Sequence, residues 1–300
     1  MPDTFAHLGV QALASRGLFK DADIKWIAVG SIIPDVPWIT QRIFLALHVP
    51  VDPYTLRFYA IVQASLFCCL LLAGAVALIA GNSRRIFLLL ALNSFLHLFL
   101  DSLQIKWANG VHFFAPFCWQ LTGFNLFWPD HPLSLLLTLA GVLALVYFGV
   151  RDADREIVLA ASLRKFLAAL LLLAAYLALP PFFTSGPQQE DNHFAATLLA
   201  VEKRPGRYVE LDRAAFHQRD NSILLLNGER IKLEGGTAPK DGLVSIKGRF
   251  SDRKTIHVSD LHVHTTRRDL NSKVALAGIL FLWLIAIARK RITFQPHSPH

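Results

Sequence analysis

Stretches without charged residues divide the chain into apolar segments long enough to cross a membrane. Five such runs are apparent, two of them only 15 residues long but flanked by Lys and Arg: 58–83, 86–100, 132–150, 166–189 and 274–288. A sixth stretch, 26–47, contains Pro34 and Pro37, so we expect its helix to kink or end near Ile33. Because a crossing needs about 20 apolar residues, fewer when basic flanks reach the surface, the pattern predicts an α-helical polytopic membrane bundle of about six spans.

Clusters of Lys and Arg assign sides to these spans. The clusters are Lys20 with Lys25, Arg84 with Arg85, the segment 151–165, and Arg289 to Arg291, and two crossings separate each from the next. Since short loops rich in Lys and Arg stay in the cytoplasm, we expect these clusters and the C-terminus there, in a cell inner membrane. The loop 106–131 and the segment 188–272 then lie outside.

The N-terminal residues predict a further short helix. The segment 4–15 carries no Lys, Arg, Asp or Glu, and Thr4 suits the N-cap position. Pairing with the 26–47 helix through the polar turn at 17–23 would bring His7 toward Asp35 at the outer face. A re-entrant or interfacial helix is the alternative. A basic region ahead of an apolar stretch is missing, so the segment does not read as a cleaved signal peptide.

Alternating apolar and polar residues replace the helical period between 195 and 264. The segments with this pattern are TLLAVE, GRYVELDRAAFH, SILLL, ERIKLEG, LVSIKGRF and TIHVSDLHVH. Asn227 and Gly228 predict a type I′ hairpin, because both of its central residues need positive φ. Five or six strands in about 75 residues predict a small all-β, OB-like barrel. We therefore expect three parts: a membrane bundle at 1–187, the barrel module at 188–272, and a C-terminal helix with a basic tail at 273–300.

Composition supports this division and restricts the partners. Apolar residues make up 53% of the chain and charged residues 17%, below the roughly 25% of soluble domains. The segment 190–269 holds 12 acidic and 14 basic residues, half of the 52 charges, so most of the net charge of +8 flanks the spans. Few aromatic residues accompany this near-neutral charge, which argues against nucleic acid. A protein, glycan or lipid headgroup is the expected partner. Cys68, Cys69 and Cys118 provide neither a disulfide framework nor a CxxC motif.

A polar stripe marks the otherwise apolar segment 87–104. His97 and Asp101 are four residues apart and share one helix face, and Asn93 and Gln104 extend it. Ionisable residues inside spans are costly and often mark functional sites. Asp35 ends the stretch from residue 26 on the same outer side. A purely structural alternative is that His97 and Asp101 bond each other and hold helices together.

Two imidazoles and two carboxylates at one membrane depth predict a metal site formed by His7, Asp35, His97 and Asp101. These ligands suit zinc, manganese or iron more than calcium, and an open coordination position lets the metal lower the pKa of a bound water to about 7.

Other histidines are weaker candidates. His112, and His131 with its neighbour Asp130, could act as general base or complete a second metal site, although a turn with a helix cap is the simpler reading of Asp130 and His131. For the group His257, His262 and His264 we favour solvated strand histidines, because only Asp260 sits at ligand spacing.

The order and spacing of these residues resemble the YdjM-type family of membrane-bound, metal-dependent hydrolases. The matching motifs are T-x-x-H-L-G from Thr4, G-x-x-x-P-D from Gly30, and H-L-x-L-D-x-x-Q-x-x-x-x-x-G-V-x-x-F-x-P-F from His97. The resemblance covers roughly the first half of the chain. It implies that His7, Asp35, His97 and Asp101 are metal ligands and that Gly110 and Pro116 shape a loop covering them.

The chain departs from that family at other positions. An Asp-x-Asp-His segment is usual where this chain has Asp35-Val36-Pro37-Trp38, and Gln63 stands where a histidine is usual, although Arg57 and Ser65 agree. These departures remove ligands and argue against a dinuclear centre.

Two functions follow as hypotheses. The first is a metal-dependent hydrolase that cleaves a phosphoester or similar bond of a lipid or envelope substrate at the outer face. The alternative is a non-catalytic, membrane-anchored scaffold or receptor that uses the outer module. Transport is a third and weaker class, because prolines interrupt only one predicted helix and no internal repeat is present.

Overall fold

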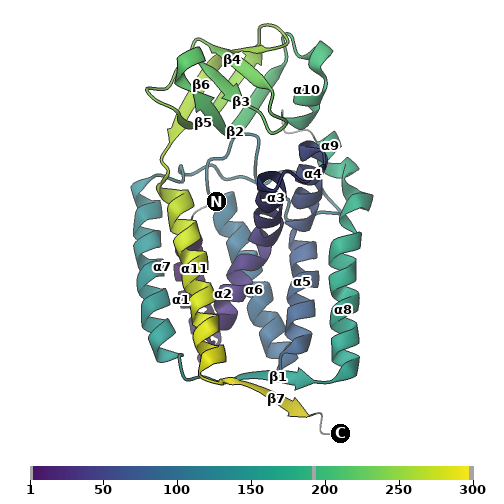
Figure 1. Ribbon diagram of the computed structural model, residues 1–300, viewed down its shortest axis with the longest axis vertical. Helices are drawn as coiled ribbons and strands as arrows, with labels where there is room; N and C mark the ends of the chain where they lie inside the picture. Colours follow the sequence, from purple (N-terminus) through teal and green to yellow (C-terminus); the bar gives the residue numbers. More distant parts are fainter. Residues whose placement is uncertain (1–2, 191–193, 297–300) are drawn as a thin grey trace.

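The computed structural model describes residues 3–190 and 194–296, and it consists of a helical bundle with a β-barrel at one end (Figure 1). Within these residues, four segments are long and apolar enough to cross a membrane: α6 (Ser83–Ser102), α7 (Pro132–Arg151), Leu163–Gln189 and α11 (Arg267–Ala288). The third comprises α8 (Leu163–Ala178), a 3-10 turn at Pro180–Phe183 and α9 (Ser185–Gln189). The described chain is therefore mainly helical, with segments that could span a membrane.

The sequence predicted one continuous span over the run 58–83, and this prediction is wrong. The run covers the end of α4 (Pro53–Gln63) and all of α5 (Leu66–Ile79), which are bent by 70° relative to each other. Ser65 causes the break, because its backbone is extended and its hydroxyl accepts a hydrogen bond from the Cys68 amide as the N-cap of α5. With this pair taken as one span, the described residues contain five candidate spans.

The predicted break near Ile33 is confirmed. Helix α2 (Ile24–Ile32) gives way to a 3-10 turn at Ile33–Asp35, and α3 (Val36–Ala46) follows. This stretch is not among the candidate spans. The first helix, α1 (Thr4–Leu18), begins one residue earlier than expected from its cap, because Asp3 and not Thr4 accepts the capping hydrogen bond from the Ala6 amide.

The first half of helix α1 is buried in the bundle. Its residues Phe5, Leu8 and Ala12 are buried, and it packs mainly against α7. Two glycines permit this close approach: a Cβ added at Gly9 would lie 2.7 Å from the Gly141 amide nitrogen, and one at Gly141 would overlap the Phe5 carbonyl oxygen. Small residues at such crossings let helix backbones come together in membranes.

The basic loops gather at the end of the bundle opposite the barrel (Figure 1). Asp152, fully buried, pairs there with Arg16 and Arg155, and its carbonyl accepts a hydrogen bond from Lys25 Nζ at 2.8 Å. Two strands absent from our sequence predictions, β1 (Ile157–Ala161) and β7 (Ile292–Pro296), pair in parallel at this end. The C-terminal tail is therefore fastened to the loop between α7 and α8.

The module forms a closed barrel in the strand order β2-β3-β4-β6-β5. Neighbouring strands are antiparallel except β4 and β6, which are parallel. The strands are β2 (Tyr208–His217), β3 (Ser222–Leu224), β4 (Arg230–Glu234), β5 (Gly242–Phe250) and β6 (Thr255–His264). The predicted strand TLLAVE is wrong: it forms the short helix α10 (Ala195–Leu199) and a 3-10 turn at Val201–Lys203.

The hairpin at Asn227–Gly228 is confirmed, but its turn type is not. Only Gly228 has positive φ, at 83°. Its amide donates to the Leu225 carbonyl oxygen at 3.0 Å, and the Leu225 amide donates to the Glu229 carbonyl oxygen at 2.9 Å. This pattern is typical of a longer hairpin loop that ends in a left-handed glycine, so one positive φ replaces the two of a type I′ turn.

Contacts of loops and helix ends fasten the barrel to the bundle. The Ala108 amide donates to Glu210 Oε2 at 2.9 Å, and Arg213 of β2 pairs with Asp269 of α11 at 2.8 Å. Because α11 begins at Arg267, only three residues after β6 ends at His264, the barrel is joined to the bundle almost without a linker.

We expect Gly141→Ala to lower the free energy of unfolding by about 3 kcal/mol, because the new methyl group would meet the α1 backbone, which cannot move aside. Gly17→Ala is the matched control on α1: nothing lies within 4 Å of its added Cβ, so stability should stay level or rise by up to about 1 kcal/mol. Thermal unfolding in detergent compares them, and equal midpoints would contradict the proposed backbone contact.

Candidate metal centre

The polar stripe of α6 is buried along its whole length. Asn93 and His97 have no exposed surface and Asp101 is 6% exposed. Gln104, just past the end of the helix, is 1% exposed, and its side-chain amide has no hydrogen-bond partner among the described residues. Their spacing of four, four and three residues places the side chains on one helical face, as the period of the α-helix requires.

His97 is oriented by the backbone of α2. Its Nδ1 lies 2.7 Å from the Ser31 carbonyl oxygen. Ser31 belongs to the last turn of α2, where carbonyl groups lack a partner further along the helix. A carbonyl can only accept, so Nδ1 carries the proton and Nε2 keeps its lone pair. That Nε2 faces Asp35 Oδ1 at 3.6 Å and Asp101 Oδ2 at 3.8 Å.

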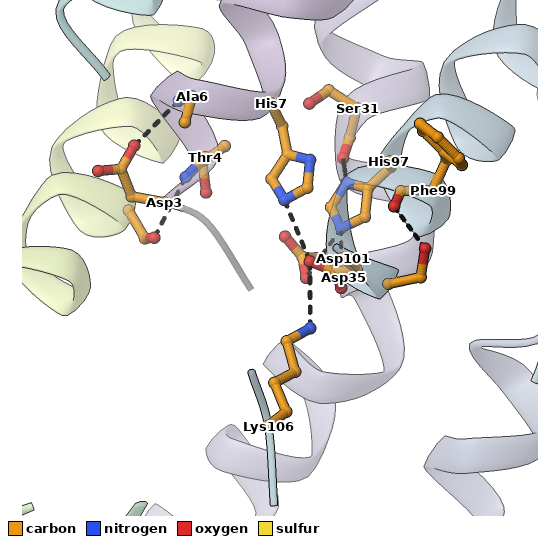
Figure 2. A network of polar contacts seen from close by, with 12 residues as sticks. Asp3, Thr4, Ala6, His7, Ser31, Asp35, His97, Phe99, Asp101 and Lys106 are labelled. Carbon is orange, nitrogen blue, oxygen red and sulfur yellow. Dashed lines mark hydrogen bonds and ion pairs between the residues drawn. The ribbon is translucent and has the colours of Figure 1, made fainter. Parts of the chain in front are cut away.

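His7 reaches the same point from α1. Its ring stacks on that of His97, with centroids 3.8 Å apart and planes inclined by 3°, and its Nε2 lies 3.3 Å from Asp101 Oδ1 (Figure 2). Both ring nitrogens of His7 and Nε2 of His97 are buried without a hydrogen-bond partner in the described part of the chain. A buried polar atom without a partner costs free energy, so these nitrogens need a ligand or an explanation.

The separations suit a metal ion. One ligand atom each from His7, His97 and Asp101 lie within 4.8 Å of one another. Bonds of about 2.0–2.2 Å in a tetrahedral zinc site would place ligand atoms about 3.3–3.6 Å apart. Asp35 contacts His97 but is not part of this group of three, so three of the four expected ligands converge closely and the fourth lies at the edge.

A lysine that the sequence analysis overlooked also faces the centre. Lys106 is 8% exposed, and its Nζ lies 3.3 Å from Asp101 Oδ1 (Figure 2). An ammonium group here neutralises the carboxylate in the absence of a metal and competes with a cation for the same oxygen. The sequence places Lys106 five residues after Asp101, but it does not indicate that the loop after α6 brings the Lys106 side chain back to the Asp101 carboxylate.

Asn93 positions the centre from below. Its side-chain nitrogen donates to Ser15 Oγ at 2.9 Å and to the Leu89 carbonyl oxygen at 2.7 Å, and the Asn93 backbone carbonyl oxygen accepts a hydrogen bond from Gln11 Nε2 at 2.9 Å. Gln11 and Ser15 lie one and two turns after His7 on α1. These bonds fix α1 against α6 and so hold His7 beside His97.

Two further positions from the sequence analysis lie in the loop after α6. Gly110 lines a cavity of about 450 Å³ between bundle and barrel, together with Asp101 and Lys106. It also lines a smaller one of about 50 Å³ that Asp101 and His112 share. Pro116, preceded by a cis peptide bond, lines neither cavity.

The candidate general bases differ in position. His112 is buried, and its Nδ1 lies 2.7 Å from the Trp119 carbonyl oxygen, which leaves Nε2 as the acceptor. His131 instead caps α7, with its side chain accepting a hydrogen bond from the Leu133 amide. The expected turn with a helix cap therefore describes His131 correctly.

Asp130 turns away from the bundle and binds the barrel. Its Oδ1 lies 3.1 Å from His262 Nε2, and the His262 ring stacks on Trp128. His264 beside it has its Nε2 2.7 Å from Ser245 Oγ. The prediction of solvated strand histidines is wrong for His262 and His264, because both make side-chain contacts. The sequence could not indicate the Asp130 contact, since Asp130 lies more than 130 residues away. His262 and His264 thus have partners in Asp130 and Ser245, although Asp130, His262 and His264 also lie close enough together to hold a metal ion.

Burial, followed by the nearby Arg213 guanidinium, lowers the pKa of His264 to about 4. Asp212, His262 and Asp130 also face it. The unfolded chain, with a histidine pKa near 6.5, binds the extra proton between about pH 6.5 and 4, so stability is lost as the pH falls through this window, by about 2–3 kcal/mol. Denaturant unfolding at pH 7 and 4.5 measures this loss. His264→Gln should reduce it, and an equal loss in the variant would contradict the assignment.

No family model, no curated protein and no solved structure matches this chain. A function therefore has to be argued from the site itself, since a fold alone does not define one. The site consists of two stacked, partly unpartnered imidazoles and a carboxylate, buried at the barrel end of an apolar bundle and bordering a cavity.

Proposed function

We propose that the chain is a membrane-embedded metal-dependent hydrolase. His7, His97 and Asp101, with Asp35 at the edge, would hold one divalent metal, zinc before manganese or iron. One observation carries the proposal: three buried imidazole nitrogens lack hydrogen-bond partners, while His97 Nδ1 is held by the Ser31 carbonyl. A metal-ligating histidine typically binds the metal through one ring nitrogen and donates a hydrogen bond from the other, as Nδ1 of His97 does here.

The other residues have definable roles around such a metal. A bound divalent metal supplies a water whose pKa falls to about 7. Ser31 fixes the tautomer of His97, and His112, which borders the same small cavity as Asp101, offers its Nε2 as a proton acceptor. In the reaction, water adds across a P–O ester bond and yields a phosphate and an alcohol. The resemblance to the YdjM-type family agrees with this chemistry.

The arrangement of charge supports an outward-facing site. The basic loops gather at the end opposite the barrel, and Lys and Arg in short loops favour the cytoplasmic side. The barrel, the centre and the cavity would then face the outside of an inner membrane, and the C-terminus the cytoplasm. The barrel's strand order, with its single parallel pair between the third and fifth strands, supports an OB-like module that contacts a protein or glycan partner.

We expect purified wild-type protein to contain about one equivalent of transition metal, and His97→Ala and Asp101→Ala to lose most of it, since each removes a ligand. His257→Ala, at an exposed histidine of the barrel, is the matched control and should keep its metal. Elemental analysis measures the content, and release of phosphate from a lipid extract measures activity. Equal metal in all four proteins, or none in the wild type, would refute the proposal.

Lys106 is the observation that favours the alternative, a non-catalytic scaffold in which Asp101 simply neutralises a lysine. The variant Lys106→Met separates the two. If the centre binds a metal, removing the competing ammonium should strengthen zinc binding several-fold, because a nearby positive charge is lost. If the pair is only structural, the variant should unfold more easily, by about 3 kcal/mol, without gaining metal affinity. Zinc titration together with thermal unfolding measures both.

A further inference from the structure

The cavity of about 450 Å³ between the bundle and the barrel is lined by an excess of positive charge. Asp101, Asp212 and Asp269 are its acidic residues. Its basic residues are twice as many and come from α3, α4, the loop after α6, β2 and α11: Arg42, Arg57, Lys106, Arg213, Arg268 and Lys273. A partly open cavity with this balance of charge attracts an anion.

Three of these arginines have no acidic partner within 4.0 Å in the described residues: Arg42, which is exposed, and the partly buried Arg57 and Arg268. Arg57 instead lies against the Phe194 ring at 4.6 Å and the Trp38 ring at 5.7 Å. Arg268 has a buried Nε without any hydrogen-bond partner in that same part of the chain. Lys106 and Arg213, by contrast, are paired with Asp101 and Asp269. The surplus charge is therefore carried by guanidinium groups, whose planar donors match the oxygens of a phosphate.

An apolar groove of about 340 Å³ lies beside this cavity, between α3, α4 and α8. Its wall includes the apolar or aromatic residues Val36, Phe44, Leu56, Tyr59, Tyr176 and Leu177. Gln41 of α3 lines both spaces, so the cationic cavity and the apolar groove adjoin across one helix. Because Phe44 and Leu177 are 37% and 52% exposed, the groove is open toward the side of the bundle that a bilayer would surround.

We propose that these two spaces bind one anionic phospholipid, with its phosphate headgroup in the cationic cavity and an acyl chain in the groove. The inference rests on the proposed function and names its substrate class, since Asp101 belongs both to the cavity wall and to the candidate metal centre. Arg57 and Arg268 bind the phosphate oxygens. A neutral lipid lacks the charge that the cavity is built to hold, and inorganic phosphate lacks the chain that the groove is built to hold.

Binding of radiolabelled dioleoyl phosphatidic acid to the purified full-length protein in detergent tests the headgroup. We expect phosphatidic acid to bind at least ten-fold more tightly than dioleoylglycerol. The double variant Arg57→Gln/Arg268→Gln should bind phosphatidic acid at least about ten-fold more weakly, because it loses hydrogen bonds between charged groups. Arg84→Gln/Arg85→Gln, at the opposite end, is the control. If that double variant does not fold, a second one replaces it: Arg42→Gln/Lys273→Gln changes two exposed residues of the cavity wall and should weaken phosphatidic acid binding several-fold.

A second arm tests the acyl chain and the source of the phosphate. Leu177→Trp should fill the groove and weaken phosphatidic acid binding several-fold, whereas Leu171→Trp, 71% exposed on the same helix and outside the groove, should not. Millimolar inorganic phosphate should compete only weakly. If inorganic phosphate competes fully and Leu177→Trp has no effect, the site takes free phosphate and the lipid proposal is wrong.

The two proposals fail in different ways. His97→Ala should abolish metal binding but leave phosphatidic acid binding within about two-fold, because His97 does not line the cavity. Metal binding without a preference for phosphatidic acid over dioleoylglycerol would refute the lipid site and leave the hydrolase proposal intact. Preferential binding of phosphatidic acid by a protein that holds no metal would refute the hydrolase proposal and leave the lipid site intact.

Discussion

Scarcity of water inside the bundle is the constraint on which this structure depends, because buried ionisable groups can then bond only to one another or to the backbone. At the end opposite the barrel, the Asp152 carboxylate pairs with Arg16 and Arg155, and its backbone carbonyl accepts a hydrogen bond from Lys25. At the barrel end, His97 uses the Ser31 carbonyl and Asp101 uses Lys106. In the first group two arginines pair with the buried carboxylate, and an arginine stays protonated and cannot bind a metal. The second keeps imidazole nitrogens without partners, which is why function is sought there and not at Asp152.

The sequence was informative where the decisive physics is local. Helix period alone places His97 and Asp101 on one face, and Pro34 limits α2 whatever it packs against. The closed barrel follows from strand alternation for the same reason. Contacts between distant segments were not readable: Asp130 meets His262 across more than 130 residues, and Ser31 acts through its backbone, which no side-chain pattern encodes.

The wrong predictions have physical causes as well. TLLAVE alternates over too short a window to tell strand from helix, and tertiary packing decides, with Ala195 and Leu198 turned into the barrel core from α10. The run 58–83 has no proline to announce its break, which comes from Ser65 as a cap. Strands β1 and β7 lie among basic residues whose charge indicated a loop, and they are stabilised by pairing with each other and by the Gly81 amide, which donates to the Val158 carbonyl oxygen of β1.

Helix α11 is held at both of its ends. It leaves the barrel three residues after β6, and past its other end the chain enters β7, which pairs with β1 next to the basic loops. A rotation of the barrel about this helix would therefore apply a torque to the β1–β7 pair and strain the Arg213–Asp269 contact. The barrel is therefore tied to the bundle at two separate points, which limits how far it can turn away from the cavity.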